Sequence, residues 1–71
     1  MEAKKWMGSP PQDCDLCHQP ICGTFVDGKT TFGPWAFMCP ACHRRNGHGL
    51  GMGRGQEYQK QEDGSWLKTA G

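Results

Sequence analysis

The sequence predicts a small α+β domain that is stabilised by a bound metal ion, and three observations lead to this prediction. Two Cys-x-x-Cys pairs, Cys14/Cys17 and Cys39/Cys42, frame the central part of the chain. The stretch between the pairs has the composition of β-strands, and the second pair opens a stretch with helix start and stop residues. With 71 residues, of which 35% are hydrophobic, the chain has too few apolar side chains for a large core. Its stability therefore has to come partly from a metal ion.

The paired cysteines have the spacing of a structural zinc site. A Cys-x-x-Cys turn lets two thiolates converge on one ion, and a second pair completes the tetrahedral coordination that zinc accepts. A fifth cysteine, Cys22, makes a complete disulfide pairing impossible and is expected to be a free thiol. We therefore expect one structural Zn²⁺ per chain and a largely unfolded chain without it. The predicted ligands are Cys14, Cys17, Cys39 and Cys42.

The chain is expected to contain one zinc-binding domain over residues 14–71, preceded by a flexible lead-in over residues 1–13. The sequence Gly8-Ser9-Pro10-Pro11 has no periodicity and supports neither a helix nor a central strand. Trp6 stands out in the lead-in, because a large aromatic side chain there could fold back onto the domain. A loose tail is the default expectation for such a segment.

Residues 21–38 are expected to form a β-hairpin followed by a short strand. The first strand would end at Asp27-Gly28, a dipeptide suited to a type I′ turn, and residues 30–32 would return antiparallel to it. After a break at Gly33-Pro34, residues 35–38 would run as a strand into the second cysteine pair. The expected core is aromatic, and the same side chains have base stacking as an alternative role. These aromatic residues are Phe25, Phe32, Trp35 and Phe37.

A short helix is predicted from Pro40 to Asn46. Proline suits the first helical position, where its missing N–H costs nothing, and Gly47 suits a left-handed position just after the helix end. Residues 47–55 alternate glycine with other residues but lack the order of a phosphate-binding motif. They are expected to form an extended segment that lies close against the domain.

The last part of the chain, residues 56–70, is expected to form a second hairpin. Asp63-Gly64 would supply its turn, and Tyr58 and Trp66 could pair across it. Because the two strands are polar, the hairpin is expected at an exposed edge that could serve as a docking surface.

The charge of the chain directs any nucleic-acid binding to a local patch. The formal net charge is +1, and four thiolates with one divalent ion would bring it to −1. A chain this close to neutrality does not attract nucleic acid through its overall field. One local excess of positive charge could contact phosphates, or it could form a solvated helix end. Its residues are Arg44, Arg45, Arg54 and Lys60.

The sequence also carries expectations about location. No apolar run approaches the ~20 residues of a membrane span, and residues 1–7 lack the hydrophobic stretch of a secretory signal. Together with the unpaired cysteine, these features predict a cytoplasmic protein. No motif identifies a small-molecule substrate.

Two resemblances follow from the order of these motifs. A Cys-x-x-Cys knuckle, a hairpin and a second Cys-x-x-Cys at a helix start resemble a treble-clef zinc finger, with a zinc ribbon as the alternative. Residues 35–45 resemble the C-terminal half of HNH-type ββα-metal nucleases, in which a histidine at the position of His43 belongs to the catalytic metal. Gly28 stands where those nucleases have their general-base histidine. The resemblance therefore implies the scaffold without its hydrolytic activity.

Residues 14–71 also resemble small zinc-finger proteins of bacteriophages and prophages. The shared pattern is "VDGKT…GPWA.MC..CH…GLG.GRGQ.Y", which stands here at 26–30, 33–43 and 49–58. The resemblance implies a phage-encoded protein acting in the cytoplasm of a bacterial host, and it brings no known activity.

The sequence as a whole thus predicts a non-catalytic zinc-finger module that contacts DNA or RNA through its basic patch. The alternative is a protein-interaction module that modulates a host enzyme, with Tyr58 and Trp66 as its contact residues. A degenerate HNH-type nuclease is the minor alternative.

Overall fold

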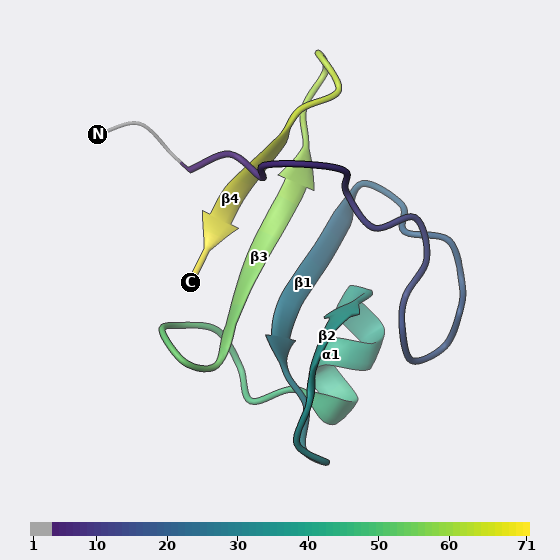
Figure 1. Ribbon diagram of the computed structural model, residues 1–71, viewed down its shortest axis with the longest axis vertical. Helices are drawn as coiled ribbons and strands as arrows, with labels where there is room; N and C mark the ends of the chain where they lie inside the picture. The colour runs from purple at the N-terminus through teal and green to yellow at the C-terminus, as the bar shows by residue number, and fades with distance from the viewer. Residues whose placement is uncertain (1–3) are drawn as a thin grey trace.

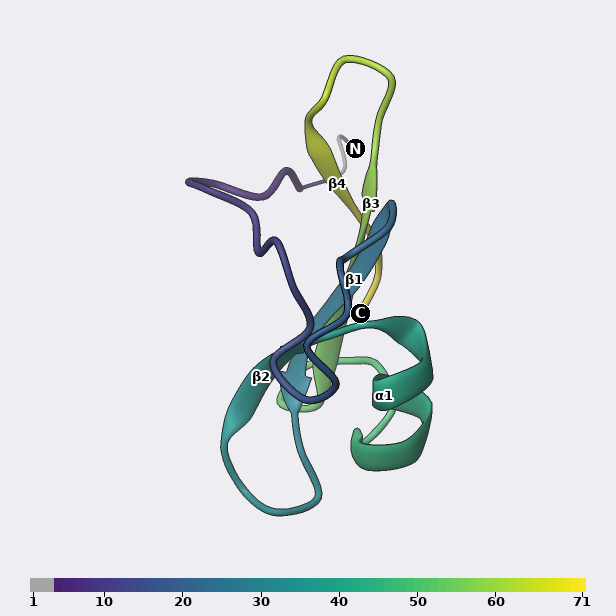
Figure 2. The same cartoon turned by 90° about the vertical axis from the view of Figure 1, so that its right-hand side faces the viewer.

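A four-stranded antiparallel sheet and one short helix make up the fold of residues 4–71, which a computed structural model describes. The strand order is β2-β1-β3-β4. The elements are β1 (Thr24–Lys29), β2 (Trp35–Met38), α1 (Pro40–Asn46), β3 (Gly55–Lys60) and β4 (Trp66–Ala70). Figure 1 shows the order of the strands, and Figure 2 shows α1 on one side of the sheet with the N-terminal segment on the other. The predicted small α+β fold is confirmed.

The first hairpin turns later in the chain than the sequence predicted. Strand β1 runs straight through Asp27 and Gly28, which pair with β2 on one side and with β3 on the other. The predicted turn at this dipeptide is therefore wrong. A side chain at Gly28 would lie 3.1 Å from the Arg54 carbonyl oxygen and 3.3 Å from Gly55 Cα. The glycine thus permits close packing of two backbones inside the sheet, a use of glycine that differs from turn formation.

Helix α1 has the boundaries that the sequence predicted, with Pro40 as its first residue. Gly47 follows it with φ −95°, so the expected left-handed conformation is absent. The Gly47 N–H still donates to the His43 carbonyl oxygen, at 2.8 Å, and closes the helix. A Cβ at Gly47 would collide with the His43 ring. This position therefore requires glycine because of that close approach.

The predicted C-terminal hairpin is present as β3 and β4. Gly64 adopts φ +88° in the connecting turn, and the Ser65 N–H donates to Asp63 Oδ1 at 2.9 Å. Trp66 pairs with Lys60, and Tyr58 pairs with Lys68, so both aromatic side chains lie on one face.

That face carries the aromatic core of the protein. Phe25 and Tyr58 stack with ring centroids 5.3 Å apart, and Trp66 packs beside Phe25 at 5.0 Å. Phe37 is partly buried against the same cluster. Two of the four aromatic residues expected in the core lie outside it: Phe32 is 61% exposed and Trp35 is 50% exposed.

The N-terminal segment covers this core. Lys5 bridges to Leu67, and the Trp6 N–H donates to the Trp66 carbonyl oxygen at 2.8 Å, so the segment lies along β4. The Trp6 ring then contacts Phe25 and Tyr58 edge-on, at 5.4 and 5.2 Å. The stretch expected to be a flexible lead-in thus contributes an aromatic ring to the core. Residues 1–3 of that stretch lie outside the described residues.

The opposite face of the sheet is covered by α1. Val26 and Met38 pair across β1 and β2 and are fully buried on this side. Met38 is followed directly by Cys39, so the strand delivers the second cysteine pair to the start of the helix. Within residues 4–71, the structure contains no helix of the length and apolarity that a membrane span requires.

Candidate metal centre

The four cysteines of the two Cys-x-x-Cys pairs converge at one point beside the sheet. Their sulfur atoms all lie within 4.8 Å of one another. Cys39 is the residue before the first turn of α1, and Cys42 lies within that turn. Cys14 and Cys17 come from a turn that precedes β1. Two segments that are distant in the sequence therefore meet at this centre.

The spacing of the sulfur atoms fits one metal ion. A tetrahedral ion with metal–sulfur bonds of about 2.3 Å has sulfur–sulfur edges of about 3.8 Å. The Sγ atoms of Cys17 and Cys39, which belong to different pairs, are 3.8 Å apart. A disulfide would require about 2.05 Å. The four-cysteine group can therefore hold one metal ion between the two pairs.

Backbone hydrogen bonds shape the first cysteine pair. The His18 N–H donates to the Cys14 carbonyl oxygen at 2.9 Å, and the Leu16 N–H points at Cys14 Sγ at 3.4 Å. His18 adopts a positive φ of 61°, which is uncommon for a residue other than glycine. This conformation redirects the chain just after Cys17, at the end of the turn that carries the first cysteine pair.

Asp15 ties the same turn to the edge of the sheet. Its N–H donates to the Phe37 carbonyl oxygen at 2.8 Å, and its Oδ2 accepts the Phe37 N–H at 2.9 Å. These two bonds occupy backbone groups on the outer side of β2. They fix the first cysteine pair beside the strand that leads into the second pair, so the sheet itself sets the geometry of the centre.

The thiols of the centre have opposite tendencies to ionise. Burial alone would raise the pKa of the Cys14 thiol, but backbone N–H groups of Cys17, Cys39 and Leu16 outweigh it and lower that pKa to about 6. Burial and the surrounding thiols raise the pKa of Cys42 to about 12. One thiolate therefore forms easily, whereas a full set of four needs a cation to balance its charge.

The composition of the group restricts the metal. Four sulfur ligands suit zinc or iron, whereas calcium and magnesium require oxygen ligands. A closed set of four protein ligands leaves no position for water or substrate, which is the arrangement of structural sites. The chemistry available at the centre is therefore cross-linking of the fold.

Cys22, His43 and His48 lie outside this group. Cys22 is an exposed free thiol. Nε2 of His43 lies 2.9 Å from the Gly49 carbonyl oxygen, and Nε2 of His48 lies 3.2 Å from the Thr30 carbonyl oxygen. Both rings thus contact loop backbone.

Three of the four cations in the predicted basic patch lie at one end of the molecule. Arg44 and Arg45 are exposed on α1, and Arg54 is exposed just before β3. Lys60 lies at the far end of β3, about 17 Å further along the strand. Figure 1 shows β3 running away from α1.

The structure adds a cation that the sequence analysis missed. Lys29 is exposed at the end of β1, and its N–H donates to the Arg54 carbonyl oxygen at 2.9 Å. Lys29 follows Asp27-Gly28, where the sequence predicted a turn, so its place at the end of β1 depends on the strand running past that dipeptide. We refer to the four residues of this region as the cationic end. They are Lys29, Arg44, Arg45 and Arg54.

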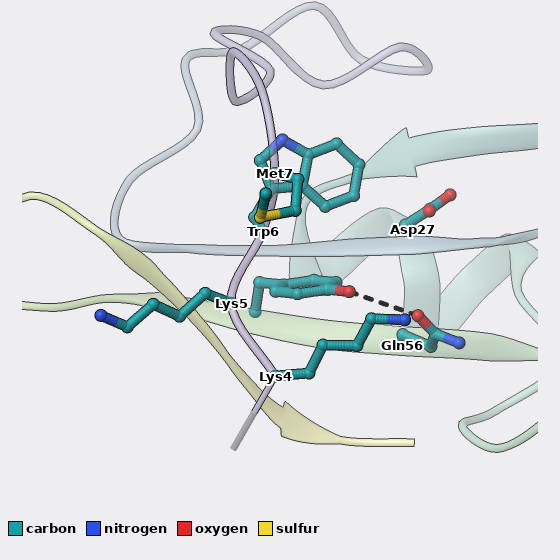
Figure 3. Close-up of a pocket in the computed structure, with 7 residues that line it drawn as sticks. Lys4, Lys5, Trp6, Met7, Asp27 and Gln56 are labelled. Atoms are coloured by element: carbon teal, nitrogen blue, oxygen red, sulfur yellow. Dashed lines mark hydrogen bonds between the residues drawn. The ribbon is translucent and has the colours of Figure 1, made fainter. Parts of the chain in front are cut away.

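A cavity of about 320 Å³ opens on the aromatic face, between the N-terminal segment and the sheet. Its lining includes Lys4, Trp6, Asp27 and Gln56, whose positions Figure 3 shows. The Tyr58 hydroxyl donates to Gln56 Oε1 at 3.3 Å along one wall. Burial raises the pKa of Asp27, so the cavity disfavours the charged form of this carboxyl group.

Tyr58 and Trp66, the residues expected at an exposed docking edge, are 3% and 8% exposed. Both belong to the aromatic core. A partner protein would therefore have to contact other residues of this chain.

Comparison with known protein families, with curated proteins and with solved structures gives no significant match to this chain. The four-cysteine centre is therefore interpreted from its own geometry.

Proposed function

We propose that this chain is a non-catalytic zinc-finger module that binds nucleic acid through its cationic end. The observation that carries the proposal is that one short helix links two features: α1 begins at the four-cysteine centre, and its last turn lies at the cationic end. A closed four-cysteine centre fixes the start of α1, and α1 carries two exposed arginines beside two further cations. Basic residues gathered on a zinc-stabilised scaffold are typical of nucleic-acid contacts.

Zinc is the metal we propose for the centre. The all-thiolate ligand set and the tetrahedral spacing support it, and a chain with few buried residues needs such a cross-link. A knuckle at Cys14/Cys17 and a second pair at a helix start also support a treble-clef arrangement over a zinc ribbon, in which both pairs lie on hairpins.

The distribution of charge supports a phosphate-binding role for the cationic end. No aspartate or glutamate stands between Asp27 and Glu57, so the whole stretch that forms this end of the fold lacks acidic residues. Three separate elements contribute its four cations, from β1, α1 and the loop before β3. Cations that belong to different elements spread over a surface wide enough to contact more than one phosphate.

A binding role without catalysis fits the centre better than hydrolysis. The four sulfur ligands leave no open metal position for a reacting water. Gly28 stands at the general-base position of the nuclease resemblance, where it is buried inside the sheet and has no group that accepts a proton. The module would act in the cytoplasm of a bacterial host if it is phage-encoded, as the resemblance to phage zinc fingers implies.

A fluorescence-anisotropy titration of the zinc-loaded protein with labelled nucleic acid tests the proposal. We expect the double variant Arg44→Ala/Arg45→Ala to bind at least tenfold more weakly and to lower the salt dependence by about one unit of slope per lost phosphate contact. Lys60→Ala is the matched control, because it removes an exposed cation at the other end of β3 and should change affinity less than twofold. Binding that is indifferent to the two arginines, or no binding at low salt, would refute the proposal.

A further inference from the structure

Two aromatic side chains remain on the surface of a protein that has few apolar residues. Phe32 is 61% exposed and Trp35 is 50% exposed. Both lie around the loop that connects β1 to β2, one at its tip and one at the start of β2. Leaving two large rings in water gives up a burial free energy of roughly 25 cal/mol for each Å² of exposed apolar surface. Such neighbouring exposed rings commonly mark a contact surface.

The loop that carries these rings is held in place by hydrogen bonds. Thr30 is fully buried, and its hydroxyl and N–H donate to the Pro34 carbonyl oxygen at 2.7 and 3.1 Å. The Thr31 N–H donates to the Asn46 carbonyl oxygen at 2.7 Å, which anchors the loop to the end of α1. The rings are therefore presented on a braced loop, and little conformational entropy is lost when a ligand covers them.

Positive charge adjoins the exposed rings. Lys29 stands directly opposite Trp35 in the pairing of β1 and β2. The bridge between Thr30 and Gly47 places the loop beside the last turn of α1, which carries Arg45. The cationic end and the two rings thus share one end of the molecule, and Figure 2 shows the loop and α1 both at this lower end.

The face that carries Trp35 leads to the cavity under the N-terminal segment. Asp27 lies two residues before Lys29 on β1, so the two share a face about 7 Å apart. Asp27, Lys4 and Lys5 all line the cavity, and in Figure 3 the Lys4 side chain extends toward Gln56 whereas the Lys5 side chain points the other way. A nucleic-acid strand that runs from the rings along this face would bring its phosphates to further cations at the cavity. Asp27 would repel a phosphate, so a base is expected to lie above this residue.

We infer that Phe32 and Trp35 stack on unpaired bases, so that the nucleic acid bound at the cationic end is single-stranded. The inference rests on the proposed function and adds the class of ligand to it. Aromatic rings beside a basic surface are the arrangement that binds single strands, because every base has a face to stack and every link has a phosphate. A duplex offers its bases edge-on in the grooves and cannot stack on these rings. Stacking and phosphate contacts do not read the 2′-hydroxyl, so DNA and RNA strands should bind alike.

Titrations with a labelled 12-nucleotide DNA strand, the RNA of the same sequence and the corresponding DNA duplex test this inference. We expect Phe32→Ala/Trp35→Ala to weaken binding of both single strands at least tenfold, given about 1–3 kcal/mol for each stacked base, and to change duplex affinity less than twofold. The exposure of both residues lets the variant keep its fold, which a thermal unfolding curve verifies. Met52→Ala removes another exposed apolar side chain outside this loop and serves as the matched control.

Trp35 also gives a direct signal. Stacking of a base on its ring should quench the indole emission of Trp35, which is the part of the total emission that Trp35→Phe removes. Trp6 and Trp66 are packed in the core, so their emission should change little. A single strand that binds without quenching this emission, or that binds no better than the duplex, overturns the inference.

The same titrations separate this inference from the proposed function. If the arginine double variant loses all binding while Phe32→Ala/Trp35→Ala binds normally, the cationic end is the binding site and base stacking is refuted. If the aromatic variant loses single-strand binding while the arginine variant keeps it, stacking stands and the proposed role of the two α1 arginines fails.

Discussion

Asp27 lies half-buried on the aromatic face of β1, between the core and the exposed end of the sheet. Its burial raises the pKa of the carboxyl group above the ordinary 3.8. A carboxyl group whose folded-state pKa is raised contributes most to stability below its unfolded pKa, and it loses that contribution as pH rises through the folded value. At neutral pH the fold therefore carries a partly buried charge that lowers its free energy of unfolding.

We expect Asp27→Asn to increase the free energy of unfolding at pH 7, because asparagine keeps the shape of the side chain and removes the buried charge. The difference between variant and wild type should shrink as pH is lowered from 7, over the range in which the thiolates still hold the zinc. Urea unfolding of the zinc-loaded proteins at several pH values measures it. Glu62→Gln, at an exposed carboxylate, is the control. A less stable Asp27→Asn protein at pH 7 would show that the carboxylate makes a stabilising contact.

His18 is a second residue whose environment leads to a prediction. Its φ of 61° costs a residue with a Cβ about 1–2 kcal/mol, whereas glycine at this position costs about 0.5–1 kcal/mol of extra chain entropy. The strain term is the larger, so His18→Gly should raise the free energy of unfolding by up to about 1 kcal/mol. Urea unfolding with zinc bound measures this change. His18→Val should lower stability, because a β-branched residue tolerates this conformation poorly. A destabilised glycine variant would instead indicate that the imidazole takes part in the metal centre.

At the scale of elements, the N-terminal segment decides how much core the sheet possesses. Trp6 contacts three aromatic rings and ties the segment to β4 through its backbone. Without it, one face of Phe25 and Tyr58 would lie open to solvent. The segment therefore acts as the cover of the aromatic face, as α1 covers the other.

We expect Trp6→Ala to lower the free energy of unfolding by about 3 kcal/mol, the usual cost of removing a packed aromatic ring. The neighbouring variant Met7→Ala should have little effect, because Met7 is 83% exposed. Chemical denaturation of both variants provides the comparison. Equal stability of Trp6→Ala and wild type would mean that the segment does not pack in solution.

The elements also show what the sequence could and could not predict. Helix α1 and the C-terminal hairpin were predictable, since Pro40 and Asp63-Gly64 act through local backbone chemistry. Gly47 marked the end of the helix correctly, although its φ is −95° and not left-handed. The turn at Asp27-Gly28 was predicted wrongly, because Gly28 serves the packing of β1 against Gly55, a contact between distant segments. Contacts between distant segments also explain why Trp35 lies outside the core and Trp6 packs into it, contrary to expectation. Which aromatic ring enters the core depends on the register of the sheet.

The candidate centre was predictable for a related reason. Cys-x-x-Cys spacing encodes a local turn with two converging ligands, and the structure brings the two predicted pairs together. The cationic end was predictable only in part. The positions of Lys29 and Lys60 depend on the length and direction of β1 and β3, which no local signal specifies.

At the scale of the whole molecule, the few buried side chains of residues 4–71 include two small groups on opposite faces of the sheet. Neither group is large enough to stabilise 71 residues with eleven glycines unaided. The four-cysteine centre joins the turn before β1 to the start of α1, and a bound ion there contributes on the order of 10–16 kcal/mol in small zinc-dependent domains. We therefore propose that metal binding and folding of this chain are one event.

Native mass spectrometry paired with amide NMR spectra tests this claim most directly. We expect one zinc ion per chain, loss of amide dispersion when a chelator removes it, and recovery of both on adding zinc. Cys39→Ser should lose the ion and the fold together, whereas Cys22→Ser should keep both because Cys22 lies outside the centre. A chain that remains folded without metal, or that binds two zinc ions, would contradict it.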